Sequence, residues 1–388
     1  MKLRLMPWRC GCGVRTFFTT TRRFETKPPF NILFFGTDSF ALETLTALQV
    51  NRLNTSEGPV VDQLHVVSTS QKSAVSKFAE KQVLRLLTWP PDQGDLDAYD
   101  LGVLVSFGRL VPRKVIAKFP YGILNVHPSL LPRWRGASPI MHSVLNSDTE
   151  TGVSIMSIQP KHFDTGPIVQ QTRMAVPERC TAESLGNVLA KEGASLLVKT
   201  LQAMPDVLHQ AKSQSCEGVT YAHKASASMA VIDWKQHKSQ QIQRQYRALA
   251  GMFPLRTTWN GEPVKLADMV LEDVHVPSVA HQGSGSDSLH SEQNVKMPEA
   301  HGSRDGGDMV EAGTVVYDPQ SKAICVKCLD GWVAFLSVIL KKRMSATDFY
   351  NGYLSKDKHK GVCFESHHNG LFSSQYLDIV HRPKAKKS

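Results

Sequence analysis

The first half of the chain alternates short apolar runs with segments of helical periodicity. Residues 31–36 form an apolar run that ends in glycine, and the polar residues 37–39 behind it can cap a helix over 40–50. Further strands are predicted at 64–68, 101–106, 123–126, 153–158 and 168–174. Further helices are predicted at 73–81, 113–118, 138–146 and 182–203. Strands that alternate with helices predict an α/β fold with a doubly wound, mostly parallel sheet, in which ligands bind at the carboxyl ends of the strands.

The second half shows a different pattern. A polar, irregular stretch at 208–220 predicts a linker, and a helix is predicted at 239–250. Short strands are predicted at 257–259, 263–270, 313–317, 323–329 and 331–337. Such strands indicate a small, OB-like β-barrel. The chain is therefore predicted to hold a first domain at 28–207 and a smaller barrel domain at 221–353.

Three segments lack the pattern that a packed core requires. Residues 276–308 are rich in Gly, Ser, His and Asp, which predicts a disordered insertion, and 354–388 are predicted to form a loosely ordered basic tail. Residues 1–24 contain five Arg, one Lys and no acidic residue, the composition of a mitochondrial transit peptide, which we assign to 1–27. The alternative for that segment is the basic tail of a cytosolic protein. No apolar run approaches the length of a membrane span, so no transmembrane helix is predicted.

Positive charge is concentrated at the start and in the second half of the chain. The formal net charge is +10, and the segment 1–24 contributes +6 of it. Residues 25–217 are neutral overall, whereas 218–270 carry +4 and 313–388 carry +6. A basic surface of this kind suits a polyanion such as nucleic acid, although a solvated basic face with a Lys-rich tail explains it equally well.

The paired cysteines Cys325 and Cys328 do not predict a metal or redox site. They form a lone CxxC within an alternating, strand-like run, whereas a zinc site needs about four ligands and a redox CxxC opens a helix. We interpret both as reduced cysteines of a strand, and we expect no metal.

The segment 122–140, GILNVHPSLLPRWRGASPI, carries the candidate chemistry. A buried strand delivers Asn125 and His127 to its carboxyl end, and alternation places both on one face. By spacing alone, a structural histidine and a turn-forming asparagine explain this pair better than a functional site does. Three neighbours change that weighting. The run Arg133-Trp134-Arg135-Gly136 places two guanidinium groups around an aromatic side chain at a turn, before a helix with Pro139 in its first turn. The prolines after His127 make the following loop rigid, and Asp164, after another strand, can orient an imidazole and fix its tautomer.

Four motifs carry a resemblance to a known family. The run NVHPSLLPRWRGASPI, the later HFDTG, the opening LFFGTDSF and the segment TYAHK resemble the methionyl-tRNA formyltransferase family. The similarity extends from about residue 30 to about residue 353, and the basic N-terminal segment favours the mitochondrial form. This family belongs to a larger group of folate-dependent formyltransferases that share an Asn-x-His…Asp active site.

The resemblance implies a reaction and roles for the site residues. The donor would be 10-formyltetrahydrofolate, and the acceptor the α-amino group of methionyl-tRNA, giving formylmethionyl-tRNA for translation initiation in the mitochondrial matrix. Asn125 would donate to the developing oxyanion, His127 would donate a second hydrogen bond or move the proton, and Asp164 would hold the imidazole. Neither a metal nor a covalent intermediate is implied, and we expect a monomer.

Further residues are candidates for substrate contacts. The stretch that lines the folate pocket in the family aligns with Ser129, Leu130, Leu131 and Pro132, and Phe40 matches an aromatic near the methionyl side chain. Plain core packing is the alternative for the two leucines. Candidate phosphate contacts are Lys72, Arg133, Arg135, Lys224, Arg244, Arg247, Lys341, Lys342 and Arg343. Each could equally brace a turn or lie solvated on the surface.

One departure from the family concerns the loop at 68–74. Bacterial members carry a long basic loop there, which enters the tRNA acceptor stem. Here the loop is short, and Lys72 is its only charge. Whether initiator tRNA is discriminated through this loop is therefore open.

Three alternatives share parts of this pattern. A formyltransferase of a small amine would use the same trio, but it gives no reason for a basic second domain. A tRNA-binding module without catalysis is disfavoured by the intact Asn125, His127 and Asp164. A formyltetrahydrofolate hydrolase, in which water replaces the amine, is not excluded by the trio alone.

Overall fold

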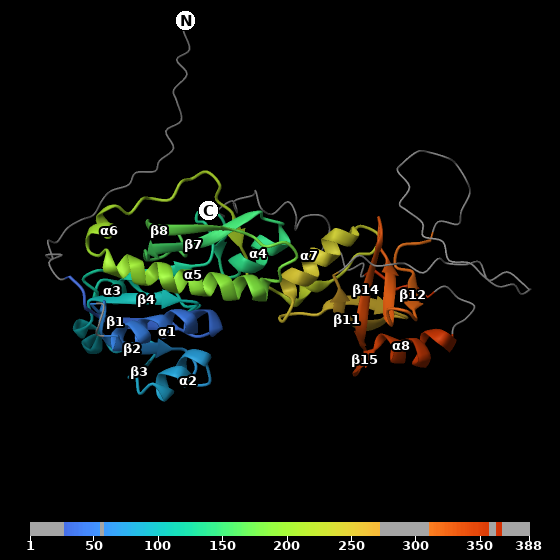
Figure 1. The fold of residues 1–388 in the computed structure, drawn as a ribbon, viewed down its shortest axis with the longest axis horizontal. Coiled ribbons are helices and arrows are strands. Elements are labelled where there is room, and N and C mark those ends of the chain that lie inside the picture. Colours follow the sequence, from blue (N-terminus) through green and yellow to red (C-terminus); the bar gives the residue numbers. More distant parts are fainter. Residues whose placement is uncertain (1–26, 55–57, 272–309, 357–361, 367–388) are drawn as a thin grey trace, which may run out of the picture.

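The computed structural model describes residues 27–54, 58–271, 310–356 and 362–366. The segment predicted as a transit peptide lies outside the described residues except for Lys27, and the predicted insertion at 276–308 and residues 367–388 of the predicted tail lie outside them altogether. The described chain forms an α/β domain and a β domain, which meet at helix α7 (Ser239–Leu249) (Figure 1). None of the helices in these ranges is both long and apolar enough to cross a membrane.

The first domain is built around a mixed, seven-stranded sheet. Its strands are β1 (Phe30–Gly36), β2 (Val61–Ser68), β3 (Leu86–Thr88), β4 (Leu101–Val105), β5 (Ile123–His127), β7 (Glu150–Ser157) and β8 (Ile168–Ala175). Their order is β3-β2-β1-β4-β5-β7-β8. Neighbouring strands from β3 to β5 run parallel, whereas β7 is antiparallel to β5 and β8 to β7. The predicted mostly parallel sheet is confirmed, and β3 was missed because a three-residue strand leaves no readable period.

Helices cover both faces of this sheet. They are α1 (Ser39–Leu53), α2 (Ala74–Lys81), η1 (Gln93–Ala98), α3 (Arg113–Ile116), α4 (Pro139–Leu145), α5 (Ala182–Gln202) and α6 (Asp206–His209). Strand β1 shows the two-sided burial. Ile32 and Phe34 belong to the buried cluster that includes α1 and α5, whereas Leu33 and Phe35 belong to the cluster that includes η1 and α3. A strand buried on both faces is apolar throughout, which is the pattern of its sequence.

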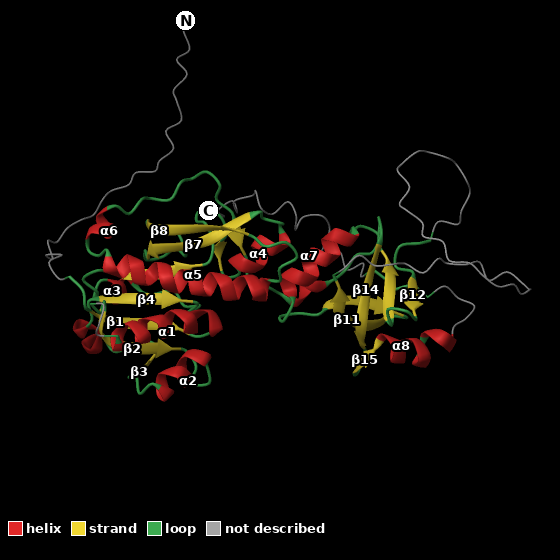
Figure 2. Ribbon diagram, viewed as in Figure 1, coloured by secondary structure: helices red, strands yellow, loops and turns green. Residues whose placement is uncertain are grey.

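The second domain is an antiparallel, six-stranded sheet with short helices, seen as the yellow strands beyond α7 in Figure 2. Its strands are β10 (Leu255–Trp259), β11 (Glu262–Val270), β12 (Val315–Asp318), β13 (Ala323–Lys327), β14 (Trp332–Ile339) and β15 (Arg343–Ser345). Its other helical segments are η2 (Ala227–Ala230), α8 (Ala346–Gly352) and η3 (Leu354–Lys356). The sheet order is β10-β11-β14-β13-β12, and β15 pairs with β14.

Residues 362–366 close this sheet. Glu365 exchanges two backbone hydrogen bonds with Thr258 of β10, and Phe364 N–H donates to the carbonyl of Gly313, just before β12, at 2.8 Å. The side chain of Phe364 is 2% exposed. The segment thus bridges the two ends of the sheet and completes the predicted barrel. This short segment of the predicted tail, with the sequence VCFES, is thus paired with the sheet, and five residues are too few to show a periodicity in the sequence.

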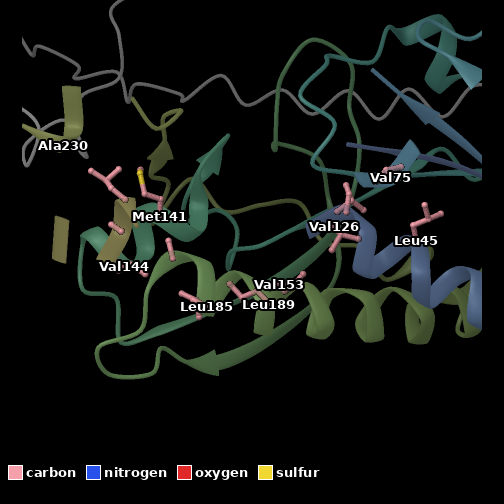
Figure 3. Close-up of a cluster of buried hydrophobic side chains, with 14 of the residues drawn as sticks. Leu45, Val75, Val126, Met141, Val144, Val153, Leu185, Leu189 and Ala230 are labelled. Atoms are coloured by element: carbon pink, nitrogen blue, oxygen red, sulfur yellow. The ribbon is translucent and has the colours of Figure 1, made fainter. Parts of the chain in front are cut away.

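The two domains share an apolar core. Helix α4 packs against α7, and Met141 and Val144 of α4 belong to the same buried cluster as Ala230 of η2 (Figure 3). At the rim, Arg247 of α7 donates to the carbonyl of Cys180, which precedes α5, at 3.2 Å. The contact between the domains is therefore a packed interface.

The predicted linker at 208–220 is fastened to the first domain. Lys212 pairs with Ile168 of β8, and β9 (Tyr221–Ala222), directly after the linker, pairs in parallel with β6 (Arg135–Gly136). Its polar composition predicted an irregular connection, and a two-residue pairing leaves no hydrophobic pattern in a sequence. The chain that enters the second domain is therefore bonded to the loop that follows β5.

Candidate active site

Two predicted site residues lie at the end of β5. The whole strand is buried, and Asn125 and His127 lie on one face of the sheet because side chains alternate along a strand. Their exposed fractions are 7% and 5%. Both therefore lie at the carboxyl end of an interior strand, the position at which α/β sheets bind ligands.

Asp164 reaches these two residues from the loop between β7 and β8. Its Oδ1 accepts from Asn125 Nδ2 at 3.4 Å and lies 3.7 Å from His127 Nδ1. Its Oδ2 accepts from the backbone N–H of Gly136 at 2.9 Å. The structure thus brings Asn125, His127 and Asp164 together, and we refer to them below as the trio.

The orientation of His127 follows from its second partner. Its Nε2 lies 2.9 Å from the backbone carbonyl oxygen of Trp134. A carbonyl oxygen only accepts hydrogen bonds, so Nε2 carries the proton. In the neutral ring Nδ1 is therefore the free acceptor, and it faces Asp164. The ring thus presents Nδ1 to the carboxylate of Asp164 at 3.7 Å, at the polar end of the site.

An open cavity of about 410 Å³ begins at the trio. Its apolar lining side chains include Leu104, Phe107, Leu110, Val111, Met156, Ile158 and Phe163. Leu110 and Phe163 are exposed at its mouth, and Arg109 contributes a positive charge to the lining. An apolar cavity of this size can hold a small organic molecule with its reactive end at the polar trio.

The predicted folate-contacting stretch is not part of the lining of this cavity. None of the four predicted residues is among those lining it, namely Ser129, Leu130, Leu131 and Pro132. Their polar groups are used elsewhere: Ser129 Oγ donates to the Arg133 carbonyl at 2.7 Å, and Leu131 N–H donates to Ser154 Oγ of β7 at 3.1 Å. These contacts fix the course of the loop after β5, and the assignment of the stretch to folate stays a prediction. Phe40 is half-buried against the main core and does not line the cavity either.

The predicted phosphate contacts divide into two groups. Those bound to neighbouring groups are Arg133 with Asp148, Arg135 with Gln214, Arg244 with Ser147, Arg247 with the carbonyl of Cys180, and Arg343 with Asp268. Those exposed and without an ion-pair partner among the described residues are Lys72, Lys224, Lys341 and Lys342. Arg133 and Arg135 in particular brace the loop after β5, so the exposed lysines are the better candidates for a polyanion.

Cys325 and Cys328 are buried free thiols, the first of them within β13 as predicted. Burial raises the pKa of Cys325 to about 11 and that of Cys328 to about 12. Such thiols stay protonated at neutral pH and are poor nucleophiles. In the described ranges, no group of three or more His, Cys, Asp or Glu side chains is arranged to hold a metal ion.

Sequence reasoning missed the groups that hold the trio in place. These groups are the Trp134 carbonyl, the Gly136 N–H, Gln214 and Thr220. For the first two the sequence offers a signal, because the RWRG motif, which predicts a turn, begins only six residues after His127. Nothing in the sequence marks Gln214, which lies in a polar stretch without a motif.

Comparisons with known proteins match most of this chain to formyltransferases. The family profile described as "Formyl transferase" matches residues 90–201, and the profile described as "Formyl transferase, C-terminal domain" matches residues 224–354. The mitochondrial methionyl-tRNA formyltransferase of Homo sapiens is 44% identical over 336 residues, which cover 86% of this chain and 80% of the human protein. The methionyl-tRNA formyltransferase of Paracoccus denitrificans is 36% identical over 251 residues, which cover 61% of this chain and 80% of the bacterial protein.

A solved structure shares the fold at low identity. The N-formyltransferase from Helicobacter canadensis superposes with a TM-score of 0.53 at 17% identity, covering 81% of this chain and 99% of that one. At this identity the likeness concerns the fold alone, and it agrees with the arrangement of sheet and second domain described above.

Proposed function

This chain belongs to the methionyl-tRNA formyltransferase family, and from that premise we propose that its trio transfers the formyl group of 10-formyltetrahydrofolate to the α-amino group of methionyl-tRNA. Its relatives from four mammals are mitochondrial forms, which indicates that this chain is a mitochondrial enzyme. We propose the matrix as its compartment, because charged tRNA is used for initiation there. The observation that carries the proposal is the meeting of Asn125, His127 and Asp164 at one end of an apolar cavity.

The acceptor amine needs little activation. A free α-amine has a pKa of about 7.7, and esterification of the carboxylate lowers it further, so much of it is unprotonated at neutral pH. Its nitrogen attacks the formyl carbon, and the carbonyl oxygen becomes an oxyanion. Asn125 Nδ2 is the buried donor available to this oxyanion, a contact typically worth about 2.7–4 kcal/mol of the barrier.

One proton must then change place. The attacking nitrogen becomes positively charged in the tetrahedral intermediate, and Nδ1 of neutral His127 accepts a proton from it. Asp164, 3.7 Å away, stabilises the imidazolium. The imidazolium then protonates N10 of the folate as the bond from the formyl carbon to N10 breaks. The new bond from carbon to the α-nitrogen remains, and His127 returns to its neutral form.

The cavity suits the donor by its chemistry. A pteridine ring is largely apolar on its faces, and the lining of the cavity is mainly aliphatic and aromatic. We place the ring there, with the formyl end toward the trio. We assign tRNA phosphates to the exposed lysines, because phosphate contacts position an RNA without reading its sequence. We propose that a monomer binds both the folate and the tRNA, since the trio and the cavity come from one chain.

The acceptor class is tested with a panel of acceptors. Residues 25–388 are incubated with formyl-tetrahydrofolate and with methionyl-tRNA, free methionine or water alone. We expect formylation of methionyl-tRNA at a kcat/KM at least about 10³-fold above that for free methionine, because the free amino acid lacks the phosphate contacts. Preferential release of formate into water would instead favour a hydrolase.

A further inference from the structure

The loop after β5 holds one residue in an unfavourable backbone conformation. Trp134 has φ +61°, in the left-handed region that bulky residues avoid, and its side chain is 1% exposed. Its carbonyl is the group that binds His127 Nε2. Such a conformation persists only where the surroundings determine it from several sides.

Two polar contacts hold Trp134 in this conformation. Its indole Nε1–H donates to Asp148 Oδ2 at 2.6 Å, and its backbone N–H donates to Thr220 Oγ1 at 2.8 Å. Thr220 is buried, and its own carbonyl accepts from the N–H of Arg135 at 2.9 Å. Asp148 lies in the loop before β7, whereas Thr220 lies in the connection between the two domains.

A second residue of the same connection, Gln214, binds the loop between β7 and β8, which carries Asp164. The side-chain amide nitrogen of Gln214 donates to the carbonyls of Asp164 at 2.9 Å and Gly166 at 2.8 Å. Its amide oxygen accepts from Nε of Arg135 at 2.9 Å and from Nη2 at 2.7 Å. Both N–H groups and the oxygen of this amide are thus used, so it joins the Asp164 loop to the loop after β5.

We propose that Thr220 and Gln214 are positioning residues for the trio, so that the connection between the domains sets the geometry of catalysis. Thr220 acts through Trp134 on the ring of His127, and Gln214 acts on the backbone of Asp164. Neither lines the cavity. A misplacement of about 1 Å in such groups can cost on the order of 10²-fold in rate. This inference rests on the proposed function and adds to it the residues that hold its reacting groups in place.

The test uses two selective substitutions. Thr220→Val keeps the shape of the side chain and removes the oxygen that accepts from Trp134, whereas Thr220→Ser restores that oxygen. Gln214→Glu keeps an oxygen that accepts from Arg135. It replaces the amide nitrogen, which donates to the backbone carbonyl of Asp164, by a second oxygen that repels this carbonyl. The matched control is Thr257→Val in the barrel, where a buried threonine oxygen likewise accepts from a tryptophan, here Trp234 Nε1 at 2.8 Å.

The measurements are kcat and KM for both substrates, the pH profile of kcat, and the ring ¹⁵N shifts of His127 in histidine-labelled protein. We expect kcat to fall roughly 10- to 100-fold in Thr220→Val and Gln214→Glu, while each KM stays within about threefold of wild type. Thr220→Val should also change the pH profile and weaken the Nε2-protonated signal of His127. Thr220→Ser should recover both, and Thr257→Val should leave kcat unchanged.

Two results would overturn the inference. One is a wild-type kcat in both Thr220→Val and Gln214→Glu. The other is an equal loss of kcat in Thr257→Val, which would mean that a general loss of stability explains the effect. These results differ from failure of the proposed function, in which the wild-type protein itself would not formylate methionyl-tRNA. The ¹⁵N measurement reports on the hydrogen bond between His127 Nε2 and the Trp134 carbonyl, and this readout does not depend on which amine is the acceptor.

Discussion

The backbone carbonyl of Trp134 accepts the Nε2 proton of His127 at 2.9 Å. This single contact decides which nitrogen of the ring is free for chemistry. Nδ1 then faces Asp164, beside the amide of Asn125, and the cavity opens from the same place. The reacting groups therefore depend on a loop whose conformation is set by neighbours far away in the sequence.

The first prediction concerns the oxyanion donor. Asn125→Ala should lower kcat by about 10²–10³-fold, because the buried amide is the donor assigned to the developing charge. The KM for folate should change little, since the amide acts mainly in the transition state. Asn146→Ala, which removes an amide bonded to the carbonyl of His142 outside the site, is the control. Equal kcat values in the two variants would contradict the role given to Asn125.

The second prediction concerns the exposed lysines of the β14–β15 turn. The double variant Lys341→Glu with Lys342→Glu should weaken binding of methionyl-tRNA and reduce the dependence of log Kd on log salt by about one unit for each phosphate that the variant no longer binds. Binding of folate should not change. Lys118→Glu is the control, because Lys118 already pairs with Asp97 on the first domain. If the salt slope stays at its wild-type value, these lysines do not bind phosphate.

The third prediction concerns closure of the barrel. Phe364→Ala should lower the free energy of unfolding by about 3–5 kcal/mol, the usual cost of truncating a buried phenylalanine. Its ring lies 6.3 Å from those of Trp234 and Phe349, measured between centroids, so the truncation opens space inside the barrel. Urea unfolding followed by tryptophan fluorescence measures the effect. Leu336→Ala, at an exposed position of β14, should cost far less, and a similar cost for both would argue against closure by this segment.

The fourth prediction concerns stability and pH. Burial lowers the pKa of His65, His142 and His237 below the ordinary value of 6.5. The unfolded chain therefore binds more protons than the folded one just below pH 6.5. By linkage, this part of the stability is complete above that pH and is lost as the pH falls through the folded pKa values. Each proton taken up on unfolding contributes a slope of at most about 1.4 kcal/mol per pH unit.

This dependence is measured by urea unfolding between about pH 7.5 and 5.5, a range that begins above the unfolded pKa and ends below it. His142→Gln keeps a donor for the carbonyl of His223, which His142 Nε2 contacts at 3.1 Å, and removes the titrating ring. We expect a smaller slope in this variant than in wild type. A slope that does not change would mean that His142 titrates alike in the folded and unfolded chains.

The sequence predicted the trio because strand alternation and motif spacing are local properties. Asn125 and His127 share a face by alternation alone, and Asp164 was added by its place after a strand and by the family motif. The contacts of Thr220 with Trp134 and of Gln214 with Asp164 join residues 86 and 50 positions apart, and no periodicity reports such pairings. They depend on the path of the linker, which composition alone described as irregular.

The same limit applies to two other segments of the chain. The motif does not reveal that the stretch from Ser129 to Pro132 is held by partners on β7 and β8. Residues 362–366 show no alternation, and their place in the barrel follows from the pairing of Glu365 with Thr258 and of Cys363 with Thr314. Long-range pairing decided both cases.

The most direct test of the central claim is a single-turnover assay with labelled formyl-tetrahydrofolate, charged methionyl-tRNA and excess enzyme. Wild type is compared with His127→Ala, and the affinity of each for methionyl-tRNA is measured. We predict that wild type moves the label to the methionyl amine, and that His127→Ala slows this step by at least about 10²-fold with affinity unchanged within a few fold. Transfer at the wild-type rate by His127→Ala would contradict the catalytic role of this histidine.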